Sequence, residues 1–301
     1  MDQKEAGSEG QNSSAVLPMG KIGNVRISRL ICGGNLIIGS AHDRDLIYIP
    51  ALMRHYFTDR KIMETWQLCE EVGINTMIGP VNSPYAYGED PTLRVYKRYR
   101  DELGGQIQWI AQTYPKTFDL TGSIQTAIDN GAVGAFIHGG IGDNWVQNNR
   151  VDLLAKAIEF IRKNGLIAGC ACHDIKVPMA MEQARVELDF YMKTLHHDNY
   201  WSATPKDQRL DYATSPNDNM WCLKPEETIE FMRTVKKSWI GFKVLAAGAI
   251  PPSEGFRFAF ENGADFIDVG MFDFQIHEDA LIARDVLDDV SRKGRPRPWI
   301  G

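Results

Sequence analysis

The 301-residue chain has few of the signals that mark disulfide-stabilised, membrane or nucleic-acid-binding proteins. Its five cysteines are scattered and odd in number, and they form no CxxC pair, which favours a reducing, cytoplasmic location over a disulfide scaffold. No apolar run reaches the roughly 18 residues of a membrane-spanning helix. No basic block interrupts the mixed charge pattern, whose formal net charge is −6. We therefore expect neither nucleic acid nor a membrane as a partner.

The N-terminal segment, residues 1–18, is poor in apolar side chains and rich in Gly, Ser, Glu and Gln. This composition predicts a disordered polar tail, followed by one folded domain at residues 19–301. The tail has no apolar core of the kind that defines a signal peptide. Export after removal of a longer leader stays open as an alternative.

From Lys21 onward, short apolar runs alternate with amphipathic stretches in eight units. Strands that alternate with helices pair in parallel, and eight such units predict closure into a (β/α)8 TIM barrel of the α/β class. The Gly-Asn turn inside residues 21–28 predicts a β-hairpin that caps the bottom of the barrel. The expected strands are Arg29–Cys32, Asn75–Ile78, Gln108–Gln112, Val133–Ile137, Ile167–Cys172, Asp189–Leu195, Phe242–Ala247 and Phe266–Val269.

Histidines gather directly after three neighbouring strands: His138 after the fourth, His173 after the fifth, and His196 with His197 after the sixth. Barrel enzymes place their reactive groups at this C-terminal end of the strands. Three neutral imidazoles, here His138, His173 and His196, can hold Zn, Fe or Mn with an open coordination position. The same side chains can instead act without metal as acid/base catalysts. No HxH or HExxH spacing decides between the two.

Other candidates follow the later strands. Lys193 lies inside the sixth strand, and if it faces the lumen it can form a Schiff base with a carbonyl; outward packing is the equal alternative. Gly248 and Gly270 follow the seventh and eighth strands, where many barrels bind a phosphate on backbone N–H groups. Asp273 adds a carboxylate at this rim.

The long segment from His196 to Pro225 mixes flat aromatic side chains with short polar ones, and the segment after the fourth strand has the same character. This mixture suits a polyhydroxylated, carbohydrate-like small molecule. The alternative is a solvated lid whose aromatic side chains serve a homo-oligomer contact. The residues concerned are Tyr200, Trp201, Tyr212 and Trp221 in the first segment, and Asp143, Asn144 and Trp145 in the second.

Several motifs in the first half of the chain resemble the aldo–keto reductase superfamily. They are the opening KIGNVRISRLICGG, the GIN at residues 73–75, the Tyr87-Gly88-Glu89 stretch and the Ala135-Phe136-Ile137-His138 strand. The resemblance implies a (β/α)8 barrel, with Tyr87 at the position of the catalytic tyrosine and His138 at that of the catalytic histidine.

The chain departs from that family at the residues that activate the tyrosine. Ile78 stands where the family has its catalytic aspartate, and Gln112 and Thr113 stand where it has its lysine. The last strand also lacks the family's nicotinamide–phosphate signature. We therefore expect an enzyme that does not use NADP, acting as a lyase, isomerase or hydrolase. The alternatives are an NADP-dependent oxidoreductase of the aldo–keto reductase type and a non-catalytic sugar-binding barrel.

Overall fold

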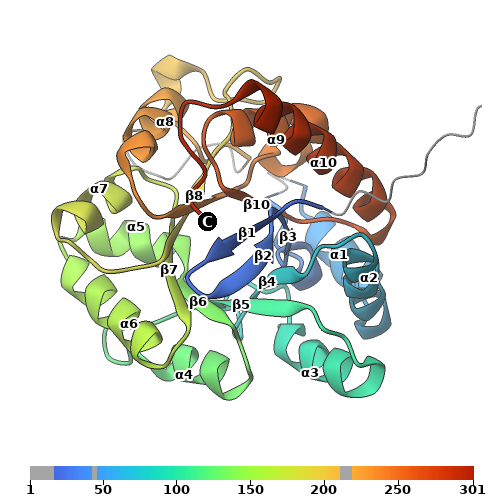
Figure 1. The fold of residues 1–301 in the computed structure, drawn as a ribbon. Helices are drawn as coiled ribbons and strands as arrows, with labels where there is room; N and C mark the ends of the chain where they lie inside the picture. The colour runs from blue at the N-terminus through green and yellow to red at the C-terminus, as the bar shows by residue number, and fades with distance from the viewer. Residues whose placement is uncertain (1–16, 43–45, 211–218) are drawn as a thin grey trace, which may run out of the picture.

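A computed structural model describes residues 17–42, 46–210 and 219–301. Eight parallel strands close into a barrel, and helices surround it (Figure 1). This confirms the predicted (β/α)8 TIM barrel. The polar tail predicted at residues 1–18 lies almost wholly outside the described residues.

The barrel strands follow one another in chain order, and the last, β10, pairs with the first, β3. A separate two-stranded antiparallel hairpin, β1 (Met19–Ile22) and β2 (Val25–Ser28), precedes them, as predicted. The barrel strands are β3 (Leu30–Gly33), β4 (Thr76–Pro80), β5 (Gln108–Thr113), β6 (Gly134–Ile137), β7 (Ile167–Cys172), β8 (Phe190–Thr194), β9 (Ser238–Phe242) and β10 (Phe266–Val269).

The helices form the outer layer, and their apolar faces pack on the barrel. In α6 (Val151–Lys163), for example, the buried side chains recur at helical spacing, and the helix ends before Gly165, which has a left-handed φ of 80°. The other α-helices are α1 (Ile49–Tyr56), α2 (Asp59–Glu71), α3 (Thr92–Leu103), α4 (Gly122–Asp129), α5 (Gly139–Gln147), α7 (Lys176–Gln183), α8 (Pro225–Thr234), α9 (Pro252–Glu261) and α10 (Ile276–Lys293).

Two apolar clusters result from the alternation of side chains along the strands. One fills the barrel interior and includes Phe136, Phe190 and Phe266. The other lies between the barrel and the helices and includes Cys170 and Cys172, which confirms that these two cysteines share one buried face of β7. Among the described residues, no helix combines the length and apolar character needed to cross a membrane.

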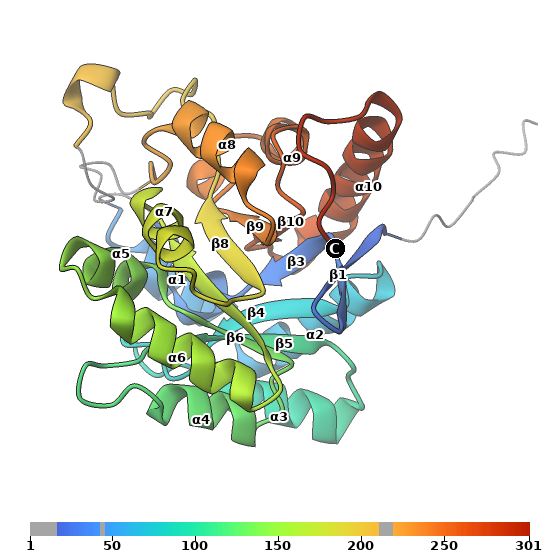
Figure 2. The same cartoon turned by 60° about the vertical axis from the view of Figure 1, so that its left-hand side comes forward.

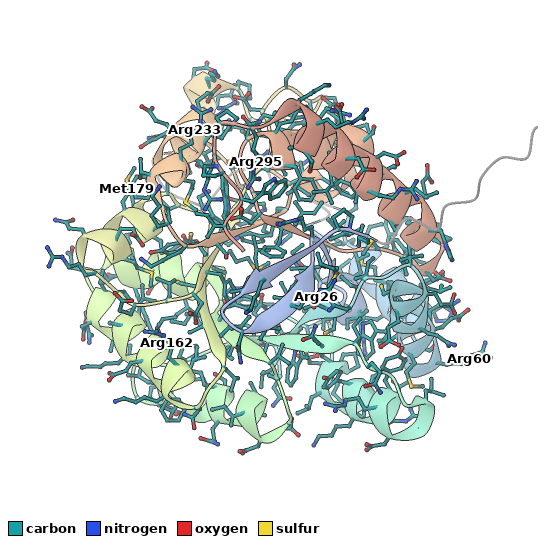
Figure 3. The ribbon with its side chains drawn as sticks, viewed as in Figure 1. Arg26, Arg60, Arg162, Met179, Arg233 and Arg295 are labelled. Atoms are coloured by element: carbon teal, nitrogen blue, oxygen red, sulfur yellow. The ribbon has the colours of Figure 1, made fainter. Side chains whose placement is uncertain are left out.

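The bottom of the barrel is closed by the hairpin and the C-terminal segment, which lie at the same end of the molecule (Figures 1 and 2). Arg295, labelled in Figure 3, stacks its guanidinium 3.4 Å from the ring centre of Trp299, and Arg29 lies 4.1 Å from the same ring. Arg295 and Arg297 both pair with the fully buried carboxylate of Asp265, at 2.8 and 2.6 Å. The chain before β10 and its last residues are thus tied together.

Two features of the outline differ from the sequence prediction. The seventh barrel strand is β9, Ser238–Phe242, and not Phe242–Ala247. The apolar run after Phe242 is a turn in which Lys243, Ala246 and Ala247 have left-handed backbones, a conformation that apolar periodicity does not reveal. The helices α1 and α5 were not among the elements expected from the sequence. The segment of α5 opens with two glycines, which weaken any helical signal.

Candidate active site

A pocket of about 850 Å³ opens at the C-terminal ends of the barrel strands. Apolar side chains from inside the barrel, including Ile78, Met192 and Phe242, form part of its lining. Polar and titratable groups also line it, among them His42, His138, His173, Lys243 and Asp268. The predicted concentration of chemistry at this end of the barrel therefore has a concave site to act in.

His173 is held in one orientation by Asp143, which lies on α5. Asp143 Oδ2 accepts a hydrogen bond of 2.7 Å from His173 Nδ1, and its Oδ1 accepts backbone N–H groups of His173 and Asp174, both at 3.0 Å. Because Nδ1 carries the proton, the lone pair of the neutral ring is on Nε2, on the side of the pocket. Burial lowers the pKa of His173, and the nearby carboxylate only partly opposes this. His173 is therefore a neutral base near pH 7.

His138, at the end of β6, has a different character. Tyr85 stacks on its ring with centroids 5.0 Å apart, and Tyr114 lies 5.2 Å away. Its Nδ1 is buried without a hydrogen-bond partner among the described residues. Burial is the main cause that lowers the pKa of His138 to about 3. The imidazole is thus neutral and suited to hydrogen bonding with a ligand rather than to carrying a proton.

Asp268 brings a carboxyl group into the floor of the pocket from β10. A Cβ atom at Gly33 would lie only 3.1 Å from its Oδ1, so the bare backbone of β3 is what admits the carboxyl group there. That oxygen is shielded and has no hydrogen-bond partner in the described part of the chain. Burial raises the pKa of Asp268 from 3.8 to about 7, although the charge of Lys243 opposes the shift. This carboxyl group can therefore hold a proton near neutral pH.

We predict that Asp268→Asn changes how stability depends on pH. The folded protein keeps a proton on Asp268 that the unfolded chain loses above pH 3.8, so this group stabilises the fold below that pH and its contribution is lost as pH rises towards about 7. Relative to the variant, the wild type should lose on the order of 1.4 kcal/mol per pH unit across that window. Urea unfolding at pH 4.5, 5.5 and 6.5 measures the difference. Parallel curves for the two proteins would contradict the assignment.

Lys243 follows β9 directly and reaches the pocket beside Asp268. Its ammonium nitrogen lies 4.6 Å from the ring centre of Trp221 and contacts Nε2 of His42. Lys243 and His42 both have left-handed backbones, with φ of 56° and 57°. A left-handed backbone costs roughly 1–2 kcal/mol in a residue with a Cβ atom, and strain of this kind is typical of functional sites.

The structure does not bring His196 together with the other two predicted metal ligands. Its Nδ1 donates to the carbonyl of His197 at 2.8 Å, and its Nε2 accepts backbone N–H groups of Trp221 and Cys222 at 3.2 and 2.9 Å. Both ring nitrogens thus hold the two ends of the long segment after β8. Within the described ranges, no three His, Cys, Asp or Glu side chains are grouped so as to hold a metal ion.

Lys193 also lies outside the pocket. It pairs in register with Cys172 and Gly241, in the layer that faces the helices, and its Nζ donates to the hydroxyl of Thr194 at 2.7 Å. The outward packing considered as the alternative is therefore the arrangement observed. A Schiff base at Lys193 has no access to the pocket.

The remaining sequence candidates do not line the pocket. Tyr87 is 54% exposed, whereas Tyr85, two residues earlier, reaches the pocket. Asp273 accepts hydrogen bonds from Tyr56 and Lys61 on the outer side of the barrel. Gly248 and Gly270, proposed for phosphate binding, are exposed at the rim, away from the pocket lining.

Sequence reasoning missed three groups that matter most here: Asp268, Lys243 and the pairing of Asp143 with His173. Asp268 had a usable signal, because a carboxylate two residues after Phe266 in a buried strand must share its inward face. Lys243 was hidden because the strand before it was misplaced. The partner of His173 is 30 residues away in sequence, a pairing that only the fold determines.

The aromatic segments are only partly in the site. Trp221 lines the pocket, and Asp143 and Asn144 line it from α5. Trp145 instead packs in the core, and Trp201 is 80% exposed. Tyr212 lies outside the described residues.

No protein-family model matches the chain, and a comparison of its sequence with curated proteins finds no match. Solved structures do match its fold. A "putative aldo-keto reductase" from Pseudomonas aeruginosa superposes with a TM-score of 0.61 and 13% identity over 92% of this chain and 99% of that one. A second structure of that description and source gives 0.59 and 13% over 89% and 95%.

A phospho-2-dehydro-3-deoxyheptonate aldolase (DAHP synthase) from Thermotoga maritima also matches, with a TM-score of 0.55 and 11% identity over 91% of this chain and 75% of that one. Identities this low establish the fold and leave the chemistry to the site. The protein thus has the fold of an aldo–keto reductase-like (β/α)8 barrel.

Proposed function

We propose that this protein is an enzyme that moves protons on a polyhydroxylated small molecule by general acid/base catalysis, as a lyase or isomerase. The observation that carries the proposal is the 2.7 Å hydrogen bond from His173 to Asp143, which leaves a basic imidazole nitrogen facing a pocket of about 850 Å³. The same pocket holds Asp268, whose pKa of about 7 makes it a proton donor.

The geometry supports the following roles. His173 Nε2 removes a proton from the carbon next to a substrate carbonyl, and the electron pair of that bond forms a carbon–carbon double bond. The carbonyl oxygen takes a proton from Asp268, which gives an enediol. In isomerisation, His173 returns its proton to the former carbonyl carbon while the Asp268 carboxylate takes the proton of the other enediol hydroxyl. In a lyase reaction, a neighbouring hydroxyl leaves as water with the proton from His173, while the enediol hydroxyl returns its proton to Asp268. His138, kept neutral, hydrogen-bonds substrate hydroxyl groups.

The pocket residues do not suit a nicotinamide cofactor. At the positions where the aldo–keto reductase family has its aspartate and lysine, the pocket is lined by the apolar Ile78 and the neutral Gln112. Burial raises the pKa of Tyr114 to about 12, so this phenol is a poor acid. The first turns of α9 and α10 carry the acidic side chains Glu254 and Glu278, which disfavour a phosphate at these helix N-termini. These residues do not fit the cofactor, and no step is assigned to it.

The test is a screen in deuterated water against aldoses, ketoses and aldonic acids, followed by proton NMR. We expect the wild type to exchange or convert at least one class of compound. His173→Gln should slow that reaction by roughly 10²–10⁴-fold and keep a cooperative melt. An equally fast variant would remove His173 from its role. If nothing exchanges but NADPH supports reduction of a carbonyl, the oxidoreductase alternative replaces the proposal.

A further inference from the structure

Lys243 is an amine that lines the pocket close to Asp268 and the two histidines, and the acid/base roles do not explain its position. It follows β9 at the strand end, and it faces the same space as Asp268, His138 and His173, whose pKa values its charge lowers. Lys193, the lysine considered for covalent chemistry from the sequence, is turned away from this space.

The amine is held in place by an unfavourable backbone conformation. Lys243 has φ of 56°, and its contact partner His42 has φ of 57°, although neither is a glycine. The strain at two residues that meet each other persists only where the surrounding fold enforces it. The result is that one amine and one imidazole, 201 residues apart in sequence, contact each other in the pocket lining.

The surroundings suit a nucleophilic amine. Nζ of Lys243 contacts Nε2 of His42, a ring nitrogen that accepts a proton. The rings of Trp221 and Phe242 lie 4.6 and 5.9 Å from Nζ, so apolar surface borders the amine, and such surface disfavours a charged group. A carboxyl group able to protonate an oxygen, Asp268, faces the same space.

We propose that Lys243 forms a Schiff base with the carbonyl carbon of an aldehyde or ketone substrate. The amine nitrogen attacks that carbon, its proton passes to His42, and His42 returns a proton to the oxygen, which gives a neutral carbinolamine. Asp268 then donates a proton to the hydroxyl group, which leaves as water, and the nitrogen lone pair forms the C=N bond of a protonated imine beside the Asp268 carboxylate. Water reverses the step after the reaction. The inference rests on the proposed function, because the imine would ease the same proton removal by His173.

The test is reductive trapping on the full chain. The protein is incubated separately with dihydroxyacetone, glyceraldehyde and pyruvate in the presence of sodium cyanoborohydride, and adducts are located by intact mass and peptide mapping. We expect one adduct, on Lys243, which is lost in Lys243→Arg. Lys176→Arg is the matched control because Lys176 lies at the rim of the same pocket, and this variant should keep the adduct.

Trace labelling with acetic anhydride at pH 7 adds a readout that needs no substrate: Lys243 should react faster than the exposed Lys156 and Lys163. An adduct confined to other lysines, no adduct with any of the three probes, or full turnover by Lys243→Arg would each overturn the inference.

The outcomes separate this inference from the proposed function. His173→Gln should still be trapped at Lys243, since imine formation precedes proton removal. If exchange depends on His173 but no Lys243 adduct forms, only the Schiff base falls. If the adduct forms while exchange ignores His173, the base assignment falls and the Schiff base stands.

Discussion

Replacing Asp143 with asparagine should lower turnover by roughly 10²–10⁴-fold while the protein stays folded. The fold survives because the amide oxygen can take the place of Oδ1, which accepts the backbone N–H groups of His173 and Asp174 at 3.0 Å. The amide nitrogen then occupies the place of Oδ2 and faces Nδ1 of His173. Since both would be donors, the imidazole must move its own proton to Nε2.

The tautomer change removes the base rather than weakening it. With the proton on Nε2, the nitrogen that faces the pocket has no lone pair to accept a substrate proton. The loss should therefore fall on kcat, with KM little changed, because Asp143 does not have to touch the substrate to act. This makes Asp143 a positioning residue in the proposed mechanism.

The tautomer can be observed without any substrate. Nitrogen-15 NMR of labelled histidine should report a protonated Nδ1 for His173 in the wild type and a protonated Nε2 in Asp143→Asn. Asp174→Asn is the matched control, since Asp174 is adjacent and, within the described part of the chain, its side chain accepts only the backbone N–H of Lys176. An unchanged His173 tautomer, or equal losses in both variants, would show that the pair is structural.

The barrel was predictable because it depends on local patterns that repeat. Buried strands such as Ile167–Cys172 and Phe266–Val269 have the bounds expected from their apolar runs. Glycines such as Gly165 end helices because glycine readily adopts a left-handed backbone, and such a glycine can be recognised in the sequence. Errors arose where local pattern and tertiary context disagree, as in the apolar turn after Phe242.

The site was less predictable because its chemistry depends on which way a side chain faces. Lys243 comes directly after the end of β9, so strand periodicity does not say which way it faces, whereas Lys193 lies within β8 and faces the helices in alternation with Phe190 and Met192. His196 and His173 both follow strands, but both ring nitrogens of His196 form hydrogen bonds with backbone groups. Periodicity constrains the direction of a side chain only inside a regular strand, and Lys243, His173 and His196 lie beyond the strand ends.

The largest stability effect should come from the opposite end of the barrel, where Asp265→Asn is expected to lower the free energy of unfolding by about 3–5 kcal/mol. The carboxylate is fully buried and pairs with Arg295 and Arg297, which are 3% and 1% exposed. Each oxygen also accepts a backbone N–H, from Ile300 and from Trp239, both at 2.9 Å. An asparagine in either orientation sets its NH₂ group against one arginine and one N–H donor.

The expected loss of stability reflects the cost of two buried guanidinium groups without a counter-charge, and it exceeds what the ion pairs contribute to stability in the wild type. Burial already lowers the pKa of Arg295 to about 10, even with the carboxylate beside it. Without the negative charge, two guanidinium groups stay in a dry site, and the C-terminal segment that carries them should detach first.

Urea unfolding and amide exchange of residues 295–301 test both expectations. Asp289→Asn, at a surface pair with Arg257 and Lys293, is the control and should unfold close to the wild type. If Asp265→Asn matches that control, the segment is held by the packing of Trp299 between Arg29 and Arg295, and the buried charge is not what closes the barrel.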